Sequence, residues 1–405
     1  MEDLIRASLD HCVKCTICET ACPVAKVTPL FPGPKYEGPQ AERFRQPTGT
    51  ADASVDYCSG CGICTQVCPQ GVKVAEINSR ARARYKDENG VRARDRIVAR
   101  PGVTGRLGTP VAPLVNRVMA NGAARRVIEK TIGIHHAAAV PTYAGHSFQR
   151  WAKLHQRRVP SRPDARSVIF FHGCSVNWFE PDLGRKVVAV LERNGVEVKM
   201  PRQGCCGLPL QSNGLFDDAR RALGRLMREL TAGGGDDPVV ASSTSCGLML
   251  KREGREILGL EDDALSALGA RTFDVCEYLL DLHDRGLLDT GFQPLAMTVI
   301  YHAACQQRGH AMGTPALDLL RLVPELQVIQ SDADCCGMAG TYGIKKEKYD
   351  IGMAVGERLF AQVRRVKPDA VACDGETCRW QITEATSQAS LHPVELLFRA
   401  YGLEL

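Results

Sequence analysis

The sequence predicts an α/β protein overall, with a mostly helical N-terminal domain followed by two duplicated, cysteine-rich α/β domains. Three observations support this prediction. One cysteine pattern occurs twice before residue 70, strands alternate with helices from residue 167 onward, and three cysteine markers recur at a nearly constant spacing. A chain of 405 residues is long enough to form several domains with their own hydrophobic cores.

The repeated pattern near the N-terminus reads C-x2-C-x2-C-x3-C-P. The first copy comprises Cys12, Cys15, Cys18 and Cys22 before Pro23, and the second Cys58, Cys61, Cys64 and Cys68 before Pro69. This is the bacterial spacing of a [4Fe-4S] site, in which the fourth cysteine of each copy binds the neighbouring cluster. We therefore expect two clusters, one held by Cys12, Cys15, Cys18 and Cys68, the other by Cys58, Cys61, Cys64 and Cys22. Zinc sites usually pair two C-x2-C units, so they fit this pattern less well.

Composition narrows the class of protein. Charged residues make up 24% and hydrophobic residues 44%, as in ordinary soluble proteins. The N-terminus lacks the basic and apolar regions of a signal peptide, and no run of about twenty apolar residues predicts a membrane-spanning helix. The net charge of +5 does not by itself indicate nucleic acid as a partner. Eighteen cysteines without an export signal indicate metal ligands in a cytoplasmic protein.

Residues 1–85 are expected to form the two-cluster domain. The segment 31–40 is rich in Pro and Gly and is predicted to be a loop. A short helix around 41–45 and a helix over 74–85 are expected. The long interval between Cys22 and Cys58 favours the mostly helical type of ferredoxin over the compact β-containing type.

Residues 86–165 are predicted to be a basic region of helix and linker. We expect a loop over 107–113, a basic amphipathic helix over 114–132 and a linker over 155–166. An amphipathic basic helix can lie at a membrane surface, or it can pack on its own protein with a solvated basic face. Nine Arg or Lys against three acidic residues between Arg80 and Arg106 allow the same two interpretations, lipid or an acidic partner on one hand and a solvated helix on the other.

From Ser167 the hydrophobic pattern alternates between strand and helix. In the first half we expect strands at 168–171, 196–200 and 239–241, with helices over 183–193, 217–230 and 275–282. In the second half we expect strands at 298–301, 326–329 and 370–372, with helices over 316–322 and 349–366. Such alternation predicts a parallel sheet in each half.

The cysteines of this region mark an internal duplication. Cys174 corresponds to Cys305, Cys205-Cys206-Gly207 to Cys335-Cys336-Gly337, and Cys246 to Cys378, at offsets of 131, 130 and 132 residues. The repeat predicts one domain over 166–285 and another over 295–405. Each marker follows a predicted strand, at the edge where parallel sheets place their sites. Each domain is therefore expected to bind one further iron–sulfur cluster; cysteines that bind zinc, or nothing, are the alternative.

These motifs resemble a known superfamily. The segments beginning at Phe171-His-Gly-Cys, Cys205-Cys-Gly, Cys335-Cys-Gly-Met-Ala-Gly and Glu376-Thr-Cys-Arg-Trp look like the CCG repeats of heterodisulfide reductase-type proteins. With Phe31-Pro-Gly-Pro-Lys and Glu42-Arg-Phe-Arg, the whole chain most resembles the family of iron–sulfur subunits of anaerobic glycerol-3-phosphate dehydrogenases. The two halves are accordingly called the first and second CCG domains.

The chain departs from the family pattern at two positions. The full motif ends each repeat with C-x-x-C, but Ser243 and Gly375 occupy the place of the first of these cysteines. Cys373 is a candidate substitute ligand. Four thiolates suffice for a [4Fe-4S] cluster, so the type of cluster in each CCG domain is left open. Cys276, outside the pattern, is expected to be a buried structural thiol, and His172 and His302 to support the sites without binding them.

The resemblance implies a function. It implies an electron-transfer subunit with no flavin of its own and no catalytic residue, peripheral on the cytoplasmic face of the membrane, relaying electrons from flavoprotein dehydrogenase subunits to the quinone pool. The alternatives are an iron–sulfur subunit of glycolate or lactate oxidation, a heterodisulfide reductase-like catalytic subunit, and a non-redox scaffold. No phosphate-binding loop or dinucleotide fingerprint is found.

Overall fold

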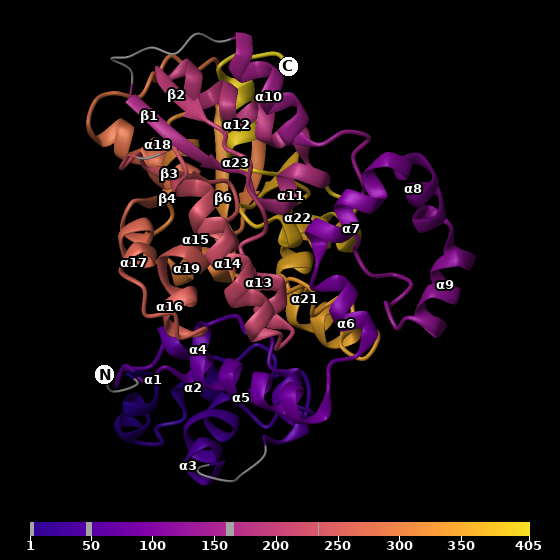
Figure 1. The fold of residues 1–405 in the computed structure, drawn as a ribbon. Coiled ribbons are helices and arrows are strands. Elements are labelled where there is room, and N and C mark those ends of the chain that lie inside the picture. The colour runs from indigo at the N-terminus through magenta and orange to yellow at the C-terminus, as the bar shows by residue number, and fades with distance from the viewer. Residues whose placement is uncertain (1–3, 46–50, 159–165, 234) are drawn as a thin grey trace.

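The structure is a computed structural model that describes residues 4–45, 51–158, 166–233 and 235–405. The N-terminal domain is helical, and no strand occurs among the described residues before position 159. Its helices are α1 (Leu4–Ala7), α2 (Ile17–Thr20), α3 (Ala41–Arg45), α4 (Ile63–Gln66) and α5 (Val74–Asn89). The helical type of ferredoxin predicted from the sequence is therefore confirmed, and the domain lies at one end of the molecule (Figure 1).

The basic region is more helical than the sequence suggested. It contains α6 (Ala93–Val98), α7 (Pro101–Gly108), α8 (Ala112–Ala120), α9 (Gly122–Thr131) and α10 (Phe148–Arg158). The predicted loop over 107–113 is wrong, because its prolines occupy the first turns of a 3₁₀ turn and of α8, where a missing N–H costs nothing. The predicted helix over 114–132 is two helices, divided at Asn121, whose side chain caps α9. Figure 1 shows α8 and α9 projecting from the body.

The predicted linker over 155–166 is also partly wrong. His155 to Arg158 belong to α10, and Arg166 begins a strand, whereas residues 159–165 lie outside the described part of the chain. Helix α10 is held by the burial of Phe148 and Ala152 against the first CCG domain.

The first CCG domain is a parallel sheet with helices on its faces. Its strands are β1 (Arg166–Phe171), β2 (Val196–Lys199), β3 (Val239–Ala241) and β4 (Thr272–Asp274). Its helices are α11 (Gly173–Trp178), α12 (Pro181–Arg193), α13 (Leu208–Ser212), α14 (Phe216–Thr231), α15 (Thr244–Leu248), α16 (Gly254–Glu256), α17 (Asp263–Ala270) and α18 (Val275–Asp284). The strand order is β2-β1-β3-β4, and Val168 lies opposite Val198.

The second CCG domain repeats this plan. Its strands are β5 (Met297–Tyr301), β6 (Leu326–Gln330), β7 (Ala370–Ala372) and β8 (Ser390–Leu391), in the order β6-β5-β7-β8. Its helices are α19 (Cys305–Gly309), α20 (Pro315–Arg321), α21 (Tyr349–Val366), α22 (Glu376–Thr386) and α23 (Pro393–Ala400). All strand pairs in both sheets are parallel, as predicted. Because the order changes direction beside β1 and β5, each sheet has a switch point at its carboxyl edge, where α/β folds bind ligands.

The two CCG domains share one hydrophobic core. Helix α12 packs on α23 and α18 packs on α20, and the core contains Val187, Leu279, Leu320 and Leu397, each at most 1% exposed. Burying such side chains contributes about 1.5–3 kcal/mol each. The two domains therefore form one continuous body, which fixes the carboxyl edges of their sheets relative to each other.

Buried ion pairs attach the N-terminal domain to the second CCG domain. The Asp56 carboxylate lies 3.1 Å from the ammonium groups of both Lys86 and Lys348. Asp95 pairs with Lys345 at 3.3 Å and with Arg94 at 2.9 Å. The lysine and arginine side chains in this network are at most 6% exposed, so the contact is enclosed between the domains.

Most of the basic stretch from Arg80 to Arg106 is used within the chain. Arg80 and Arg82 donate to backbone carbonyls of the first CCG domain, and Arg100 pairs with Asp218. Arg92 and Arg94 pair with Glu347 of the second. The stretch therefore joins domains rather than forming a solvated basic face.

The helices of the described ranges vary in length and polarity, and the longest of them, α21, has 18 residues. None of these helices is both long and apolar enough to cross a membrane.

Candidate iron–sulfur centres and the cavity between them

The structure sorts the eight N-terminal cysteines into two groups. One small cavity is lined by Cys12, Cys15, Cys18 and Cys68, and a second by Cys22, Cys58, Cys61 and Cys64. Each group thus contains three cysteines from one motif and the fourth from the other, which is the crossed arrangement that the spacing predicts.

The backbone between these cysteines explains how each loop wraps its site. Lys14 and Thr16 have φ values of 59° and 68°, in the left-handed region that non-glycine residues rarely adopt. At the same two places of the second motif the chain has Gly60 and Gly62, with φ values of 71° and 78°. The left-handed turns bring the thiols onto one side of the loop, so the pattern of cysteines and the backbone geometry serve the same site.

Burial raises the pKa of these thiols. The pKa of Cys18 rises to about 11 because of burial, with Glu19, Cys12 and Cys68 adding repulsion, and that of Cys22 also rises to about 11 through burial. Packed thiols of this kind carry no charge on their own. A multiply charged iron core supplies the positive charge that stabilises thiolates, so an all-thiol, buried donor set fits an iron–sulfur cluster.

In the first CCG domain the four predicted cysteines converge at the carboxyl edge of the sheet. The sulfur atoms of Cys174 and Cys205 lie 3.9 Å apart, and those of Cys206 and Cys246 lie 3.6 Å apart. Gly207 follows with φ of 91°, and a Cβ there would lie 2.8 Å from the carbonyl oxygen of Ala219. The Cys-Cys-Gly order thus turns two adjacent thiols toward one site while the chain packs closely on α14.

The second CCG domain brings five thiols together. The sulfur atoms of Cys336 and Cys378 are 3.0 Å apart, and Cys305 and Cys335 lie beside them, all buried. Cys373, which is fully buried, contacts Cys378 and raises its pKa. Cys373 is therefore placed where the sequence suggested a substitute ligand. A Cβ on Gly337 would lie 1.8 Å from the Gly352 carbonyl oxygen, so only glycine fits there.

Ser243 contributes a hydrogen bond in place of the thiol that the family motif has there. Its hydroxyl donates to the Glu376 carboxylate at 3.0 Å, which joins the site of the first CCG domain to helix α22 of the second. Burial raises the pKa of Glu376. The first site thus has four thiols and the second five, so the two repeats differ chemically.

The two predicted supporting histidines are buried and neutral. His172 and His302 are at most 2% exposed, and burial lowers the pKa of each to about 4. The His172 ring nitrogen Nδ1 lies 2.8 Å from the Gly173 carbonyl oxygen. Neither ring nitrogen of His302 has a hydrogen-bond partner within the described residues, and its environment includes Cys335. A buried orphan ring of this kind fits a position beside a bound inorganic group.

Contacts between domains set an order for the sites. Cys61 of the N-terminal domain lies in one buried cluster with Cys305 and Cys335 of the second CCG domain. Repulsion from the Cys335 sulfur adds to burial in raising the pKa of Cys61. The group containing Cys61 is therefore next to the second CCG site. The other N-terminal group is nearer to solvent, since Cys15 is exposed.

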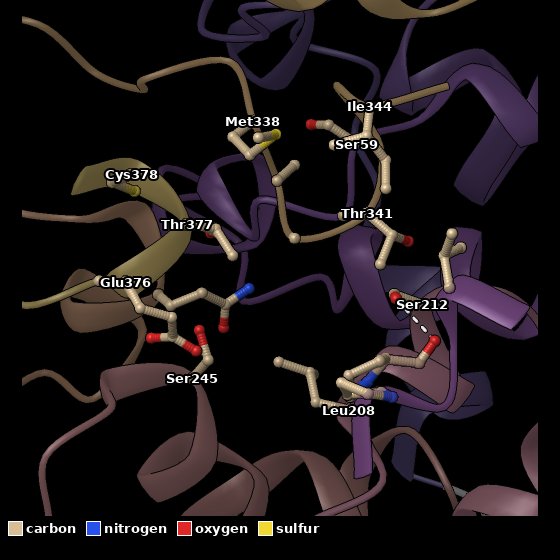
Figure 2. A pocket seen from close by; sticks show the side chains of 18 of the residues that line it. Ser59, Leu208, Ser212, Ser245, Met338, Thr341, Ile344, Glu376, Thr377 and Cys378 are labelled. Atoms are coloured by element: carbon tan, nitrogen blue, oxygen red, sulfur yellow. Dashed lines mark hydrogen bonds between the residues drawn. The ribbon is translucent and has the colours of Figure 1, made fainter. Parts of the chain in front are cut away.

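A cavity of about 410 Å³ lies between these sites. Cys61, Cys174, Cys305, Cys336 and Cys378 all border it, so it touches three of the four cysteine groups. Figure 2 shows Glu376 and Ser245 on one side, with Leu208, Ser212 and Thr341 across from them. The motifs gave no sign of this cavity, because its walls come from every domain.

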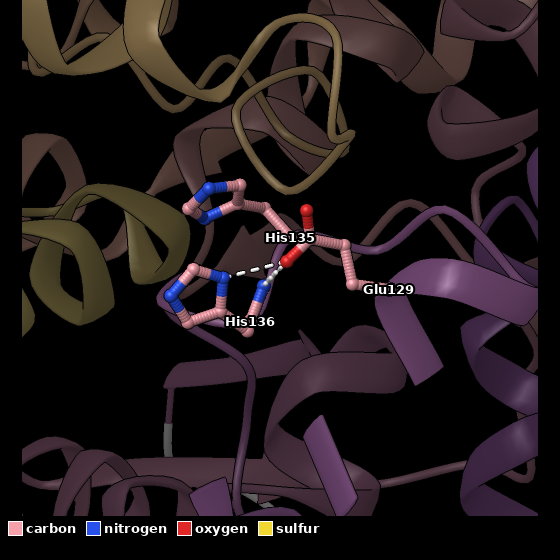
Figure 3. Close-up of side chains that lie close together, drawn as sticks. All are labelled: Glu129, His135 and His136. Atoms are coloured by element: carbon pink, nitrogen blue, oxygen red, sulfur yellow. Dashed lines mark hydrogen bonds and ion pairs between the residues drawn. The ribbon is translucent and has the colours of Figure 1, made fainter. Parts of the chain in front are cut away.

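Two further groups have the spacing of metal ligands. Glu129, His135 and His136 lie together after α9, where the His136 ring is 2.6 Å from the Glu129 carboxylate (Figure 3). That hydrogen bond lowers the pKa of Glu129 to about 2. Asp274, Cys276 and Asp374 form a buried group at the edge of both sheets. Cys276 is fully buried on α18, which confirms its predicted burial.

Comparison with known proteins identifies the domains. The family described as a 4Fe-4S dicluster domain matches residues 8–72, and the cysteine-rich domain family known as CCG matches residues 168–251 and 299–383. The first match spans both N-terminal cysteine motifs, and the other two coincide with the repeats seen in the sheets.

Similar proteins share the whole chain or parts of it. The iron–sulfur subunit of anaerobic glycerol-3-phosphate dehydrogenase from Escherichia coli is 37% identical over 404 residues, which cover 97% of this chain and 98% of that protein. Lactate utilization protein A of Geobacillus thermodenitrificans is 31% identical over 44% of this chain and 74% of its own. One subunit of the fumarate reductase (CoM/CoB) of Methanothermobacter marburgensis is 28% identical over 62% of this chain and 49% of its own. Since the first likeness extends over both ferredoxin motifs, the basic region and both CCG domains, the chain belongs to the family of iron–sulfur subunits of anaerobic glycerol-3-phosphate dehydrogenases.

Proposed function

We propose that this chain carries electrons from flavoprotein subunits that oxidise sn-glycerol 3-phosphate to the quinone pool. The observation that supports this most strongly is the buried contact of Cys61 with Cys305 and Cys335, which places a ferredoxin site directly against a CCG site. Iron–sulfur clusters are one-electron carriers, and their potentials are tuned by burial and hydrogen bonds to sulfur.

The ligands follow the groups that the structure brings together. In the ferredoxin domain, Cys12, Cys15, Cys18 and Cys68 hold the outer cluster and Cys58, Cys61, Cys64 and Cys22 the inner one. The first CCG domain contributes Cys174, Cys205, Cys206 and Cys246. The second contributes Cys305, Cys335, Cys336 and Cys378, with Cys373 as a candidate fifth ligand.

The order of the sites gives the relay a direction. The outer ferredoxin site, with Cys15 exposed, receives electrons from a flavoprotein partner. The inner site passes them to the second CCG domain, and the cavity separates that domain's site from the first CCG site. The whole-chain likeness to an iron–sulfur subunit of a glycerol-3-phosphate dehydrogenase favours that substrate over lactate or glycolate, for which the likeness covers less than half of this chain.

Rapid freezing of the reacting complex tests this order. The chain, purified without oxygen together with its flavoprotein subunits, is mixed with sn-glycerol 3-phosphate and frozen at intervals for EPR. Ferredoxin-type signals are expected before CCG-type signals. Reduction of the CCG sites first, or no reduction of the ferredoxin sites, would contradict the relay.

The same proposal places the chain on the cytoplasmic face of the membrane. Four large apolar side chains follow one another at helical spacing along α7 and the start of α8, and all are about half exposed or more: Val103 53%, Leu107 70%, Val111 48% and Leu114 65%. Arg106 and Arg117, both exposed, flank this stripe. Apolar residues beside basic ones suit the interface of anionic lipids, so this stripe is the proposed membrane contact.

Sedimentation with vesicles tests the membrane contact. The full chain is expected to bind vesicles containing anionic phospholipid, and Leu107→Glu with Leu114→Glu should reduce the bound fraction severalfold. Leu154→Glu is the matched control, since Leu154 is 48% exposed on α10, away from the stripe. Equal binding by all three proteins would overturn this part of the proposal, and a stripe that instead covers a flavoprotein partner would appear as loss of complex formation.

A further inference from the structure

The cavity between the cysteine groups has a wall that belongs to none of them. Val115 and Met119 on α8 and Ile128 on α9 line it from the side of the projecting helices. Val140, Pro141 and Tyr143, from the segment after α9, extend the same wall. An apolar wall of this kind contacts no cluster thiol in the motifs, so it is free to contact an apolar molecule.

The size of the cavity suits a small organic molecule. Its volume of about 410 Å³ lies within the range of roughly 300–1,000 Å³ typical of small-molecule sites. Cysteines of both CCG domains border the same space, so a molecule held there lies within reach of two one-electron carriers. A two-electron acceptor with an apolar body is the chemical class that fits such a place.

One carboxyl group in the cavity is suited to donate a proton. Glu253 lines the cavity and accepts a hydrogen bond from the Gln211 side chain at 2.9 Å. Burial raises its pKa to about 7, and Glu76 on α5 adds repulsion, while the Gln211 hydrogen bond opposes the rise. The other charged groups facing it are Arg252 on the same helical segment and Glu256 on α16. Glu253 is thus protonated in an appreciable fraction of molecules near neutral pH, unlike an ordinary glutamic acid.

The route from Glu253 to water is short. Glu256, whose side chain is 28% exposed, lines the same cavity and pairs with Lys73 and Arg252. A proton given up by Glu253 can therefore be replaced from solvent through this polar end of the cavity. The apolar wall of α8 and α9 and this polar corner divide the cavity into a binding part and a proton-supplying part.

We propose that this cavity is the site where a quinone is bound and reduced, with α8 and α9 forming the apolar wall and Glu253 donating the protons. The proposal rests on the electron relay proposed above. The two carbonyl groups of the quinone become hydroxyl groups by taking up two electrons and two protons. The electrons come from the reduced flavin of the partner chain through the cysteine-held clusters, and each proton comes from the Glu253 carboxyl, which is reprotonated from water between the two transfers.

Photolabelling tests where the quinone lies, without measuring turnover. The cluster-containing full chain is labelled with an azido-naphthoquinone, and the modified peptides are mapped by mass spectrometry. Label is expected on α8 and α9, and Ile128→Trp, which fills the cavity, should reduce it at least tenfold. Val127→Trp is the matched control, because Val127 is the neighbouring residue, is 59% exposed and does not line the cavity. Label elsewhere, or equal labelling of both variants, would overturn the assignment.

The oxidation rate of the reduced chain tests the proton donor. The chain is reduced with dithionite and mixed with a short-chain naphthoquinone or with ferricyanide, which needs no proton. Quinone-driven oxidation should slow as pH rises through about 7 in the wild type and should be at least tenfold slower in Glu253→Gln, with partial rescue in Glu253→Asp. Ferricyanide should oxidise all variants equally. An unchanged rate and pH profile in Glu253→Gln would exclude this role.

The two proposals fail differently. A chain without reducible clusters fails the relay, and neither oxidant then reports anything about the cavity variants. A chain whose clusters are oxidised by quinone at one rate in every variant retains the relay and loses the cavity assignment. Should Ile128→Trp not retain its clusters, Met119→Trp with Val118→Trp as its control repeats the comparison on α8, since Met119 lines the cavity and Val118 does not.

Discussion

Asp56 is predicted to control how firmly the ferredoxin domain is attached to the second CCG domain. Its carboxylate lies 3.1 Å from both Lys348 and Lys86, whose side chains are 2% and 6% exposed. Despite burial, Lys348 and Lys86 hold the pKa of Asp56 below its usual range. Asp56→Asn keeps the shape of the side chain and removes its charge, so two buried ammonium groups lose their shared partner.

The size of the effect follows from the burial. Removing one partner of a buried ion pair costs about 3–5 kcal/mol, because the remaining charge stays desolvated. Lys86 retains Asp95 at 3.9 Å, so we expect the lower end, about 3 kcal/mol. Asp52→Asn is the control. Asp52 caps the same turn by accepting from the Ser54 amide, and asparagine caps equally well, so its change should be under about 0.5 kcal/mol.

The pH dependence of this deficit has a definite sign. Burial lowers the pKa of Lys348 to about 7, below the 10.5 of a free lysine. A lysine with a depressed pKa in the folded state destabilises the fold at lower pH, where the unfolded chain binds the proton more readily, and the penalty fades as pH rises. Without Asp56 the Lys348 pKa falls further, so the deficit of Asp56→Asn should be larger at pH 6 than at pH 9.

The assay is the apparent melting temperature of the cluster-containing chain, followed by visible absorbance at both pH values. Asp56→Asn should melt several degrees below the wild type and Asp52→Asn should not. Equal melting temperatures for the two variants, or a deficit that grows with pH, would refute the reasoning about this network.

Two other predictions concern the CCG domains. Gly337→Ala should abolish the cluster of the second CCG domain, since its Cβ would meet the Gly352 carbonyl at 1.8 Å, whereas Gly340→Ala, at φ of 65° with open space around it, should cost only about 1 kcal/mol; iron content and EPR compare the two, and retention of the signal in Gly337→Ala would contradict the packing argument. Cys276→Ala should leave iron per chain unchanged while lowering the melting temperature by a few degrees, because Cys276 fills a fully buried position on α18 that belongs to neither cysteine group; loss of iron would assign it to a cluster instead.

Sequence patterns predicted the strongly periodic elements well. The helix expected over 349–366 coincides with α21, and the strands expected at 239–241 and 370–372 coincide with β3 and β7, because short apolar strands between helices have few alternatives in a parallel sheet. Strands β4 and β8 were not predicted. They have three and two residues, are partly polar, and form only through pairing with β3 and β7.

The candidate site divides in the same way. The cysteine spacing was sufficient to predict which thiols meet in the ferredoxin domain, since the crossed arrangement is a property of two local loops. The contact of Cys61 with Cys305, the cavity and the role of Glu253 depend on contacts across hundreds of residues, for which no local pattern exists. The basic stretch was ambiguous for the same reason, because the acidic and carbonyl partners of its arginines lie in other domains.

Iron and acid-labile sulfide per chain, with EPR on anaerobically purified protein, test the central claim that four cysteine groups form one relay. About sixteen iron atoms per chain, with two signals distinct from those of the ferredoxin sites, are expected for four clusters of four irons each. About eight iron atoms with ferredoxin signals only would mean that the CCG cysteines hold no cluster, and the path from the ferredoxin domain to the cavity would not exist.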